Sequence, residues 1–503
     1  MFLSELLSDV CVTGITDLCD TSTHICVNGI ASDCSRVMPG NVFICISGSR
    51  TDGHLYAVDA VRRGASCIIA ERPVPVGVPV VIVDSTRSAA AHVWNRWYCY
   101  PAENMHVTAV TGTNGKTSVT YFVREILAGV HKHVGLIGTV KCMAGDDTLS
   151  FGGGSEIAGM AAAMTTPDPE YLYGALHEMR RRGVTHVVME ASSHALSQRK
   201  LDPISADIAV FTGLSPEHLD FHGTMKDYLL AKSVLFRDAR RSIINADDFY
   251  APMLQREVPG EYIKVGTDPA RVREYDFFAG DVRYSTGAVT YTLFCDAGKY
   301  EIKCPMPGRF GLYNSALAVS AAMSTGVGGN EAAEALKNFG GVPGRMETIS
   351  TVGGVHIMRD FAHTPEAMKG ALEIAKGETS GRLWVLFGCG GDRDRTKRPV
   401  MGRIASEMAD HTVVTSDNCR SENRETIIND IMSGFDVKRV HTIIPDRAEA
   451  IRFAVMMADE GDTVLLCGKG HENYEICADG MRPFDEVAIV RSAVSERFGD
   501  VLN

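Results

Sequence analysis

Short apolar runs alternate along the chain with stretches of helical periodicity, and most of these runs are uniformly hydrophobic. Such runs are typical of parallel strands that are buried on both faces of a sheet. Helical patterns or glycine-rich loops follow them, which predicts an α/β protein. The predicted strands are residues 42–46, 67–70, 80–83, 106–110, 186–190, 208–211, 383–387, 411–415 and 463–467, and the clearest helices are 118–127, 427–432 and 448–457.

One stretch has a different pattern. Residues 273–304 alternate polar and apolar positions and are rich in Tyr, Val and Thr, which predicts antiparallel strands added to the central sheet. The whole pattern divides into three domains, because 503 residues exceed what one core holds. We expect a small α/β domain over residues 1–104. A central domain with a phosphate-binding loop should follow over 105–343, and a Rossmann-like domain over 344–503.

Composition narrows the class of protein. Hydrophobic residues are 45% and charged residues 22% of the chain, which excludes a mostly disordered protein. The formal net charge of −12 argues against non-specific nucleic-acid binding, because that needs a positive surface. No apolar run approaches the length needed to span a membrane. The 14 cysteines form no CxxC pair, so we expect free thiols and a cytoplasmic protein without a signal peptide.

The string TGTNGKTS, residues 111–118, stands between a predicted strand and a predicted helix. A glycine turn at the start of a helix presents backbone N–H groups to phosphate, and a lysine there reaches the outer phosphates. We expect Lys116 to contact the outer phosphates and Thr117 or Ser118 to offer a hydroxyl to Mg²⁺. The spacing departs from the common G-x-x-x-x-G-K-[ST] string, because the first glycine is Gly112. The loop predicts a nucleotide site with Mg²⁺.

Further chemistry-bearing residues follow the next strands. Glu190 ends a strand where a carboxylate could hold the nucleotide's Mg²⁺, although such residues also cap turns. His218 and His222 could be ligands or structural histidines, and Lys232 alone reads as an exposed helix charge. In the third segment, three loops follow strands: GCGGDRDRTKRP at 388–399, DNCR at 417–420 and GKGHEN at 468–473. Their cations suit an anionic substrate, so the residues predict an enzyme that combines a Mg-nucleotide with an anion.

The motifs together resemble those of one family. TGTNGKTS, MEASSHAL, LSPEHLDFHGTMKDYLLAK, GRFGLYNSALA, VPGRME, DFAHTPEA, GCGGDRDRTKRP, DNCR and GKGHE follow one another as they do in the Mur ligases. The resemblance covers nearly the whole chain and implies ATP-dependent ligation through an acyl phosphate, in peptidoglycan precursor synthesis. It implies UDP-N-acetylmuramoyl-L-alanyl-D-glutamate as acceptor and a free diamino acid as the third residue.

The same resemblance assigns roles to individual residues. It implies Lys116, Glu190, His218 and Lys232 at the catalytic centre, where Thr117, Glu190, His218 and a carbamate on Lys232 would hold metal. For ATP it implies Gly112, Thr113, Asn114, Gly115, Lys116, Thr117, Ser118, Asn314, Arg345, Asp360 and His363. For the UDP-substrate it implies Ser35, Thr165, Thr166, Ser192, Gln198 and Lys200. For the amino acid it implies Arg393, Asp417, Asn418, Arg420, Gly468 and Glu472.

Three positions depart from the family's pattern. Lys200 stands where Arg is usual, Gly213 stands where Asn is usual, and DNCR replaces DNPR. Arg420 favours a distal carboxylate and therefore meso-diaminopimelate. A loop without proline could let Arg420 swing out and favour lysine or ornithine instead. A folylpolyglutamate synthetase-like ligase and a non-catalytic nucleotide-binding regulator are the remaining alternatives. We expect the protein to act as a monomer.

Overall fold

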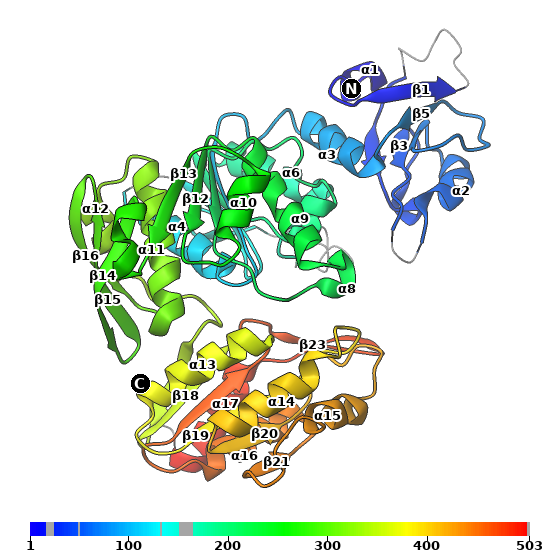
Figure 1. Ribbon diagram of the computed structural model, residues 1–503. Helices are drawn as coiled ribbons and strands as arrows, with labels where there is room; N and C mark the ends of the chain where they lie inside the picture. The colour runs from blue at the N-terminus through cyan, green and yellow to red at the C-terminus, as the bar shows by residue number, and fades with distance from the viewer. Residues whose placement is uncertain (17–24, 49–50, 131–132, 150–163, 500–503) are drawn as a thin grey trace.

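The computed structural model describes the chain apart from residues 17–24, 49–50, 131–132, 150–163 and 500–503. Three α/β bodies, each built on its own sheet, follow one another in chain order (Figure 1). The predicted three-domain α/β fold is therefore confirmed. The exact boundaries near residues 104 and 343 stay predictions. Within the described residues, no helix is long and apolar enough to cross a membrane.

The first sheet has the order β1-β5-β4-β3-β2, and only β1 is antiparallel to its neighbour. Its middle strands are buried on both faces, as their uniform hydrophobicity predicts. The strands are β1 (Val12–Thr16), β2 (Gly29–Ala31), β3 (Asn41–Ile44), β4 (Cys67–Ala70) and β5 (Val80–Val83), and the α-helices are α1 (Leu3–Leu6), α2 (Ala57–Arg62) and α3 (Thr86–Trp97).

The central sheet has the order β16-β15-β14-β13-β12-β11-β6-β10-β7-β8-β9. Its parallel middle runs from β14 to β7, and antiparallel strands extend it at both edges. The strands are β6 (His106–Thr111), β7 (Val134–Ile137), β8 (Cys142–Ala144), β9 (Asp147–Thr148), β10 (His186–Glu190), β11 (Ile208–Phe211), β12 (Arg241–Asn245), β13 (Tyr262–Gly266), β14 (Phe277–Ser285), β15 (Ala288–Cys295) and β16 (Gly298–Cys304).

Helices cover both faces of this sheet. One face packs against α4, α11 and α12, and the other packs against the remaining helices and against the first domain. These helices are α4 (Lys116–Gly129), α6 (Pro169–Arg181), α7 (Ser193–Ser197), α8 (Leu219–His222), α9 (Met225–Arg237), α10 (Ala251–Glu257), α11 (Gly308–Ser324) and α12 (Gly329–Lys337).

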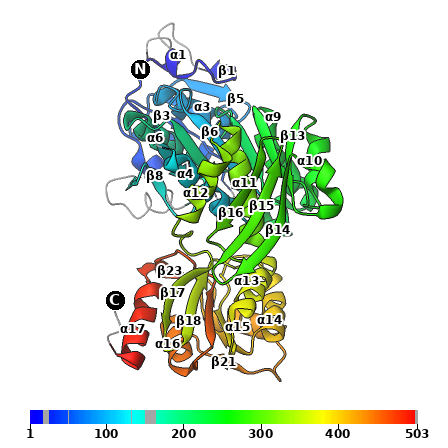
Figure 2. The ribbon, with the colours of Figure 1, turned by 90° about the vertical axis from the view of Figure 1, so that its left-hand side faces the viewer.

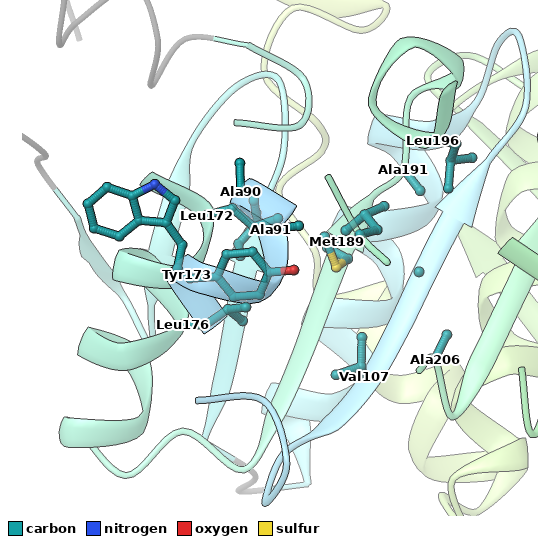
Figure 3. Packing of buried hydrophobic residues seen from close by; sticks show 14 of the residues in the cluster. Ala90, Ala91, Val107, Leu172, Tyr173, Leu176, Met189, Ala191, Leu196 and Ala206 are labelled. Carbon is teal, nitrogen blue, oxygen red and sulfur yellow. The ribbon is translucent and has the colours of Figure 1, made fainter. Parts of the chain in front are cut away.

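The first and central domains share a hydrophobic core. Helix α3 packs on α6, and Figure 3 shows Ala90 and Ala91 of α3 beside Leu172 and Tyr173 of α6. All four side chains are buried in one cluster with Met189 of β10. Because burial of this apolar surface is favourable, it ties the first domain to the central one.

The third sheet has the order β17-β18-β22-β19-β20-β21 and is parallel except at β17. One face packs on α13, α14 and α15 and the other on α16 and α17 (Figure 2). Its elements are β17 (Glu347–Val352), β18 (Val355–Asp360), α13 (Pro365–Glu378), β19 (Leu383–Phe387), α14 (Lys397–Met408), β20 (His411–Val414), α15 (Arg424–Met432), β21 (His441–Ile443), α16 (Arg447–Met457), β22 (Thr463–Cys467), the hairpin β23 (Tyr474–Cys477) and β24 (Gly480–Pro483), and α17 (Glu486–Phe498).

Candidate functional site

The glycine loop joins β6 to α4, with Gly115 as the N-cap and Lys116 as the first residue of that helix. Gly112 and Gly115 have φ angles of +150° and +86°, which L side chains rarely adopt, and a Cβ at Gly115 would lie 2.4 Å from Asn314 Oδ1. Lys116 Nζ donates to the carbonyl oxygens of Gly112 (3.0 Å) and Thr113 (2.8 Å). Burial lowers the pKa of Lys116. The loop has the geometry of an anion site at a helix N-terminus.

Glu190 lies beside this loop at the end of β10. Its carboxylate accepts hydrogen bonds from the Thr117 hydroxyl (3.2 Å) and from the Thr139 N–H (2.8 Å). Arg345, from the chain that leads into the third domain, donates to the same Thr117 hydroxyl at 3.0 Å. Of the two hydroxyls predicted for Mg²⁺, Thr117 faces this carboxylate, whereas Ser118 lines a small neighbouring cavity.

Lys232 on α9 is buried, with 1% of the residue exposed, so reading it as an exposed helix charge is wrong. Its Nζ donates to the Gly112 carbonyl at 2.7 Å and lies 4.6 Å from the centre of the Tyr228 ring. Burial, followed by the charge of Lys116, holds the pKa of Lys232 well below its usual value, and Glu217 only partly opposes this. The side chain is therefore a buried amine beside the phosphate loop.

His218 begins α8 and packs edge-on against His194, with the ring centres 4.8 Å apart. Burial lowers the pKa of His218 to about 4. The neighbouring Glu217 lies 3.4 Å from His363 Nε2 of the third domain. Burial would raise the pKa of Glu217, but His363 outweighs it and holds the pKa below its usual value. Glu217 and His363 thus join the two domains beside the phosphate loop.

A cavity of about 1030 Å³ lies between the central and third domains, next to the glycine loop. Asn314 of α11 lines it, as do Asn114 and Asp248. Burial raises the pKa of Asp248 to about 6. A Cβ at Gly213 would lie 2.6 Å from Asp248 Oδ2, so Asp248 fills the space beside this glycine. The cavity is large enough for a nucleotide-sized ligand.

The third domain closes the far side of the nucleotide region. Asp360, at the end of β18, accepts hydrogen bonds from the N–H groups of Met346 (2.7 Å) and Ala362 (2.8 Å). Burial raises the pKa of Asp360 despite the nearby Arg345, whose guanidinium lies 4.7 Å from the centre of the Phe361 ring. Asp360 and Arg345 also line the small cavity with Asn314.

Three of the residues predicted for the UDP-substrate, Thr165, Thr166 and Ser192, are linked by hydrogen bonds around Glu190. The Thr166 hydroxyl donates to the Glu190 carbonyl at 2.8 Å and lies 3.3 Å from the Ser192 hydroxyl, which caps α7. Thr165 accepts from the Thr139 hydroxyl at 3.0 Å. This set is therefore built directly onto the strand that carries the carboxylate.

Lys200 extends the set toward the first domain. Its Nζ lies 2.7 Å from Asp168 Oδ1. Two residues further on, Glu170 pairs with Arg36 of the first domain, next to the predicted Ser35, with Arg36 Nη1 2.8 Å from Glu170 Oε2. Ser35 is exposed, and both its N–H and its hydroxyl donate to Asp33 at 2.8 Å. Gln198 follows α7 and is half-buried.

In the third domain, the loops after β20 and β22 meet at Asn418. The Asn418 amide donates to Glu472 at 2.8 Å. Gly468 has a φ of +114°, and a Cβ there would lie 2.8 Å from Asp417 Oδ2. Burial would raise the pKa of Asp417, but Lys469 and then Arg447 outweigh it and lower that pKa.

Arg420 is held in place by its own loop. Its N–H donates to the Ile476 carbonyl at 3.0 Å, and its guanidinium donates to the Gly391 carbonyl at 2.9 Å. The sequence suggested that, without a proline at position 419, Arg420 could swing out to solvent. In the structure it does not. Burial, followed by the charge of Arg420, lowers the pKa of Arg393. Two guanidinium groups thus lie near each other, where an anion would be stabilised.

The sequence analysis missed the roles of three charged side chains, although each lies within a quoted motif. Glu217 and Lys469 are neighbours of predicted site residues. Arg398 is fully buried and pairs with Glu422 and Asp430 at 2.8 Å, so part of the charged loop 388–399 is a structural anchor rather than a ligand contact. The sequence does show that each is a charged residue in a motif with glycine turns. It does not show whether the side chain contacts a ligand or forms a structural ion pair, because that depends on burial in the folded protein.

The glycine loop, the strand-end carboxylate, the buried amine and the paired guanidiniums define a nucleotide-dependent enzyme that also binds an anionic substrate. Models of known families agree. Residues 27–98 match the catalytic domain of the Mur ligase family, residues 110–322 match the Mur ligase middle domain, and residues 344–470 match the Mur ligase glutamate ligase domain.

Curated relatives extend the match over the full length. The UDP-N-acetylmuramoyl-L-alanyl-D-glutamate–2,6-diaminopimelate ligase of Geobacillus thermodenitrificans is 39% identical, over 92% of this chain and 94% of its own. The ligase of that name from Listeria monocytogenes is 35% identical over 99% and 100%. A solved structure under the same enzyme name is 29% identical, with a TM-score of 0.68 over 99% of both chains. The chain belongs to the Mur ligase family.

A more distant likeness shows the fold alone. Mycobacterium tuberculosis folylpolyglutamate synthase is 17% identical with a TM-score of 0.64, over 77% of this chain and 92% of its own.

Proposed function

We propose that the protein joins meso-diaminopimelate to UDP-N-acetylmuramoyl-L-alanyl-D-glutamate at the expense of ATP, a step of peptidoglycan precursor synthesis. The observation that carries this proposal is Arg420, whose guanidinium donates to the Asn418 carbonyl at 3.3 Å next to the hydrogen bond between Asn418 and Glu472, and whose charge reaches Arg393. A distal carboxylate on the amino acid would neutralise the two guanidiniums, and lysine and ornithine have none. The relatives' names give the same substrate pair.

The nucleotide end of the cleft supports the first half of the reaction. Enzymes of this family use ATP. The terminal phosphate of ATP would lie on the glycine loop, with Lys116 and Arg345 neutralising its charge, and the nucleoside would lie in the cavity beside Asn314. The D-Glu carboxylate attacks that phosphorus, ADP leaves, and an acyl phosphate forms. Positioning and charge neutralisation supply most of the rate enhancement in such transfers.

Mg²⁺ is the expected counterion of the phosphates, and its own chemistry is to neutralise charge on the transferring group. Among the described residues, no group of three His, Cys, Asp or Glu side chains is placed to hold a metal ion. Thr117, Glu190 and His218 fit such a role only with further oxygen ligands. A carbamate on Lys232 would supply them. The lowered pKa of Lys232 favours its neutral amine. That amine can add CO₂ and release a proton, which gives the carbamate anion.

The second half of the reaction needs the amine of the incoming amino acid close to the acyl phosphate. Arg393 lies within electrostatic reach of Asp220 and His194 of the central domain, which supports docking of the amino-acid site against that domain. The amine attacks the acyl carbon, phosphate leaves, and the amide forms. On the other side, Thr165, Thr166, Ser192, Gln198, Lys200 and Ser35 would hold the UDP-substrate.

A panel of amino acids tests the proposal. The protein is mixed with ATP, Mg²⁺ and UDP-N-acetylmuramoyl-L-alanyl-D-glutamate, and phosphate release and product mass are measured with diaminopimelate, lysine or ornithine. We expect turnover with diaminopimelate and little with the others. Equal or greater turnover with lysine or ornithine would replace the proposed amino acid. A lack of turnover with every amino acid would favour the non-catalytic regulator, and turnover with a folate would favour the folylpolyglutamate ligase.

A further inference from the structure

Lys469 follows Gly468 in the third domain and has no exposed surface. Its Nζ donates to the Tyr474 carbonyl at 2.8 Å and to Asn418 Oδ1 at 3.1 Å. It also lies 3.5 Å from Asp417 Oδ1 and 3.9 Å from Glu472 Oε2. An ammonium group has three N–H donors, and these oxygens occupy its surroundings. Lys469 therefore cannot reach a substrate, although it touches three residues predicted to bind one.

The contacts of Lys469 fix the orientation of the Asn418 amide. Asn418 Oδ1 accepts from both Lys469 Nζ and the Ile476 N–H, the latter at 2.9 Å. Two lone pairs are thus used by two donors. A turned amide would place its NH₂ group against an ammonium and an N–H, which have nothing to accept. The NH₂ group must therefore face away from Lys469, where one hydrogen goes to Glu472 at 2.8 Å. Among the described residues the second N–H of this group has no acceptor, and it is the donor that a ligand would use.

We propose that Lys469 is a positioning residue that makes Asn418 a hydrogen-bond donor toward the incoming amino acid, so that the pocket requires an acceptor at the distal end of that molecule. This inference rests on the proposed function, because it assumes that the amino acid lies beside Asn418 and Arg420. A distal carboxylate satisfies this N–H, whereas lysine has only an ammonium at that end and leaves the N–H without an acceptor. Lys469 thus helps to set the choice between diaminopimelate and lysine without touching either.

The surroundings allow Lys469 to be replaced without collapse of the site. Arg447 lies behind the same loop, donates to the Ser416 carbonyl (3.2 Å) and to the Cys467 carbonyl (2.9 Å), and pairs with Glu486 at 2.7 Å. It also contributes to the lowered pKa of Asp417. The buried Asp417 therefore keeps a cationic neighbour when Lys469 is removed. Methionine retains most of the lysine stem and removes the donors.

The experiment compares Lys469→Met, Asn418→Ala and the double variant with the unaltered protein. Steady-state kcat and KM are measured for ATP, the UDP-substrate, diaminopimelate and lysine. We expect Lys469→Met to raise the KM for diaminopimelate about 10-fold or more, with the KM for ATP within about twofold. The ratio of kcat/KM for diaminopimelate to that for lysine should fall about 10-fold, because only the Ile476 N–H and Glu472 then hold the Asn418 amide, so its donor orientation is less strictly fixed.

The double variant separates positioning from a structural role. If Lys469 acts through Asn418, Lys469→Met adds little to the loss already caused by Asn418→Ala. Additive losses, or a lower kcat with an unchanged KM for diaminopimelate and an unchanged selectivity ratio, would overturn the inference. Where the methionine variant does not fold, Lys469→Gln keeps a neutral NH₂ donor group and should give a selectivity between those of the unaltered protein and Asn418→Ala. Use of diaminopimelate by the unaltered protein tests the proposed function separately.

Discussion

The phosphate loop of the central domain and the DNCR loop of the third domain each bring two cationic side chains close together. At the phosphate loop, Lys116 and Lys232 both donate to the Gly112 carbonyl, and burial lowers both pKa values. At the DNCR loop, Arg420 is bonded to backbone carbonyls and lowers the pKa of Arg393. Lysines can lose their charge when buried, but guanidiniums cannot. The first region can therefore change its charge, whereas the second stays cationic and is offset by Asp220 and Asp392 and by an anionic ligand.

The two regions also differ in how they are assembled. The phosphate loop is one short segment between β6 and α4, and it meets Glu190 at the end of β10, Lys232 of α9 and Asn314 of α11. The amino-acid region joins loops after β19, β20 and β22 with the hairpin β23–β24, which are far apart in the sequence. Substitutions at the first should stop the chemistry, and substitutions at the second should change which amino acid is used.

The largest expected effect is at the phosphate loop. Lys116→Ala removes the charge nearest the transferring phosphoryl group, and kcat should fall by about 10³-fold, as it does when other fixed electrostatic contacts to a transition state are removed. Phosphate release under saturating substrates measures the effect. Near-normal turnover in a folded variant would remove Lys116 from the proposed centre.

Substitution of Lys232 tests whether its amine is converted to a carbamate anion beside the phosphate loop. Lys232→Ala should lose about 10²-fold or more in kcat, and added acetate or formate should restore part of it, because a small carboxylate can replace a carbamate. The matched control is Lys226→Ala, an exposed lysine on the same helix, which should retain normal activity. Loss of activity without rescue, together with an unmodified Lys232 in intact mass spectra taken under CO₂, would contradict the carbamate.

The phosphate loop could be predicted from the sequence because its information is local. The string 111–118 contains the turn glycines, the lysine and the helix start, and the preceding apolar run predicts the strand. The three-domain plan and the parallel sheets follow from the same periodicity. The predicted boundaries are less accurate. Helix α4 begins at Lys116 rather than at residue 118, and strand β3 ends at Ile44 rather than at residue 46.

The rest depends on burial between distant segments, which one sequence does not contain. From the sequence, Lys232 resembles an exposed helix charge, and only the fold shows that its amine contacts Gly112. Lys469 likewise resembles an ordinary loop residue, and only the fold shows its contact with Asn418. Short antiparallel strands such as β8 and β9 carry too few residues to show a period. Their pairing is decided by the neighbouring strand rather than by their own pattern.

At the amino-acid region, Arg420→Ala should change selectivity more than the chemical step. The kcat/KM for diaminopimelate should fall about 100-fold, because its distal carboxylate would lose a charged partner in a partly buried pocket. The kcat/KM for lysine, which has no such carboxylate, should change little. An equal loss for both amino acids would mean that Arg420 supports the loop rather than the ligand. Competition between the two amino acids in one reaction, read by product mass, gives the ratio directly.

A smaller effect is expected on the pH dependence of the free energy of unfolding, through His471, which lies between the two regions. Burial, followed by Arg345, lowers the pKa of His471 from 6.5 to about 4. Between these values the unfolded chain binds the proton and the folded protein does not, so the free energy of unfolding decreases as pH falls from 6.5 to 4. His471→Gln removes this contribution. The difference in the free energy of unfolding between pH 7 and pH 5 should shrink by about 2 kcal/mol, and the difference in Tm by about 4–8 °C for a domain of roughly 150–250 residues. An unchanged difference would mean that His471 is not kept neutral by the fold.

The smallest expected effect is at Cys419, where the sequence departs from the family's DNPR string. Within the described part of the chain, the Cys419 N–H donates no hydrogen bond, so a proline would lose none there. The neighbouring Arg420 is already held by the Ile476 and Gly391 carbonyls.

Cys419→Pro should therefore leave the preference for diaminopimelate intact and change its kcat/KM by less than about threefold. Proline restricts the unfolded chain, which stabilises by about 0.4–1 kcal/mol where the backbone is compatible. Loss of the buried thiol, whose Sγ lies 3.9 Å from the Ile476 carbonyl, offsets part of this gain. Kinetics with diaminopimelate and lysine, together with Tm, measure both effects. A marked gain in selectivity on restoring proline would show that hydrogen bonds alone do not fix Arg420 and that the rigid backbone is part of the amino-acid site.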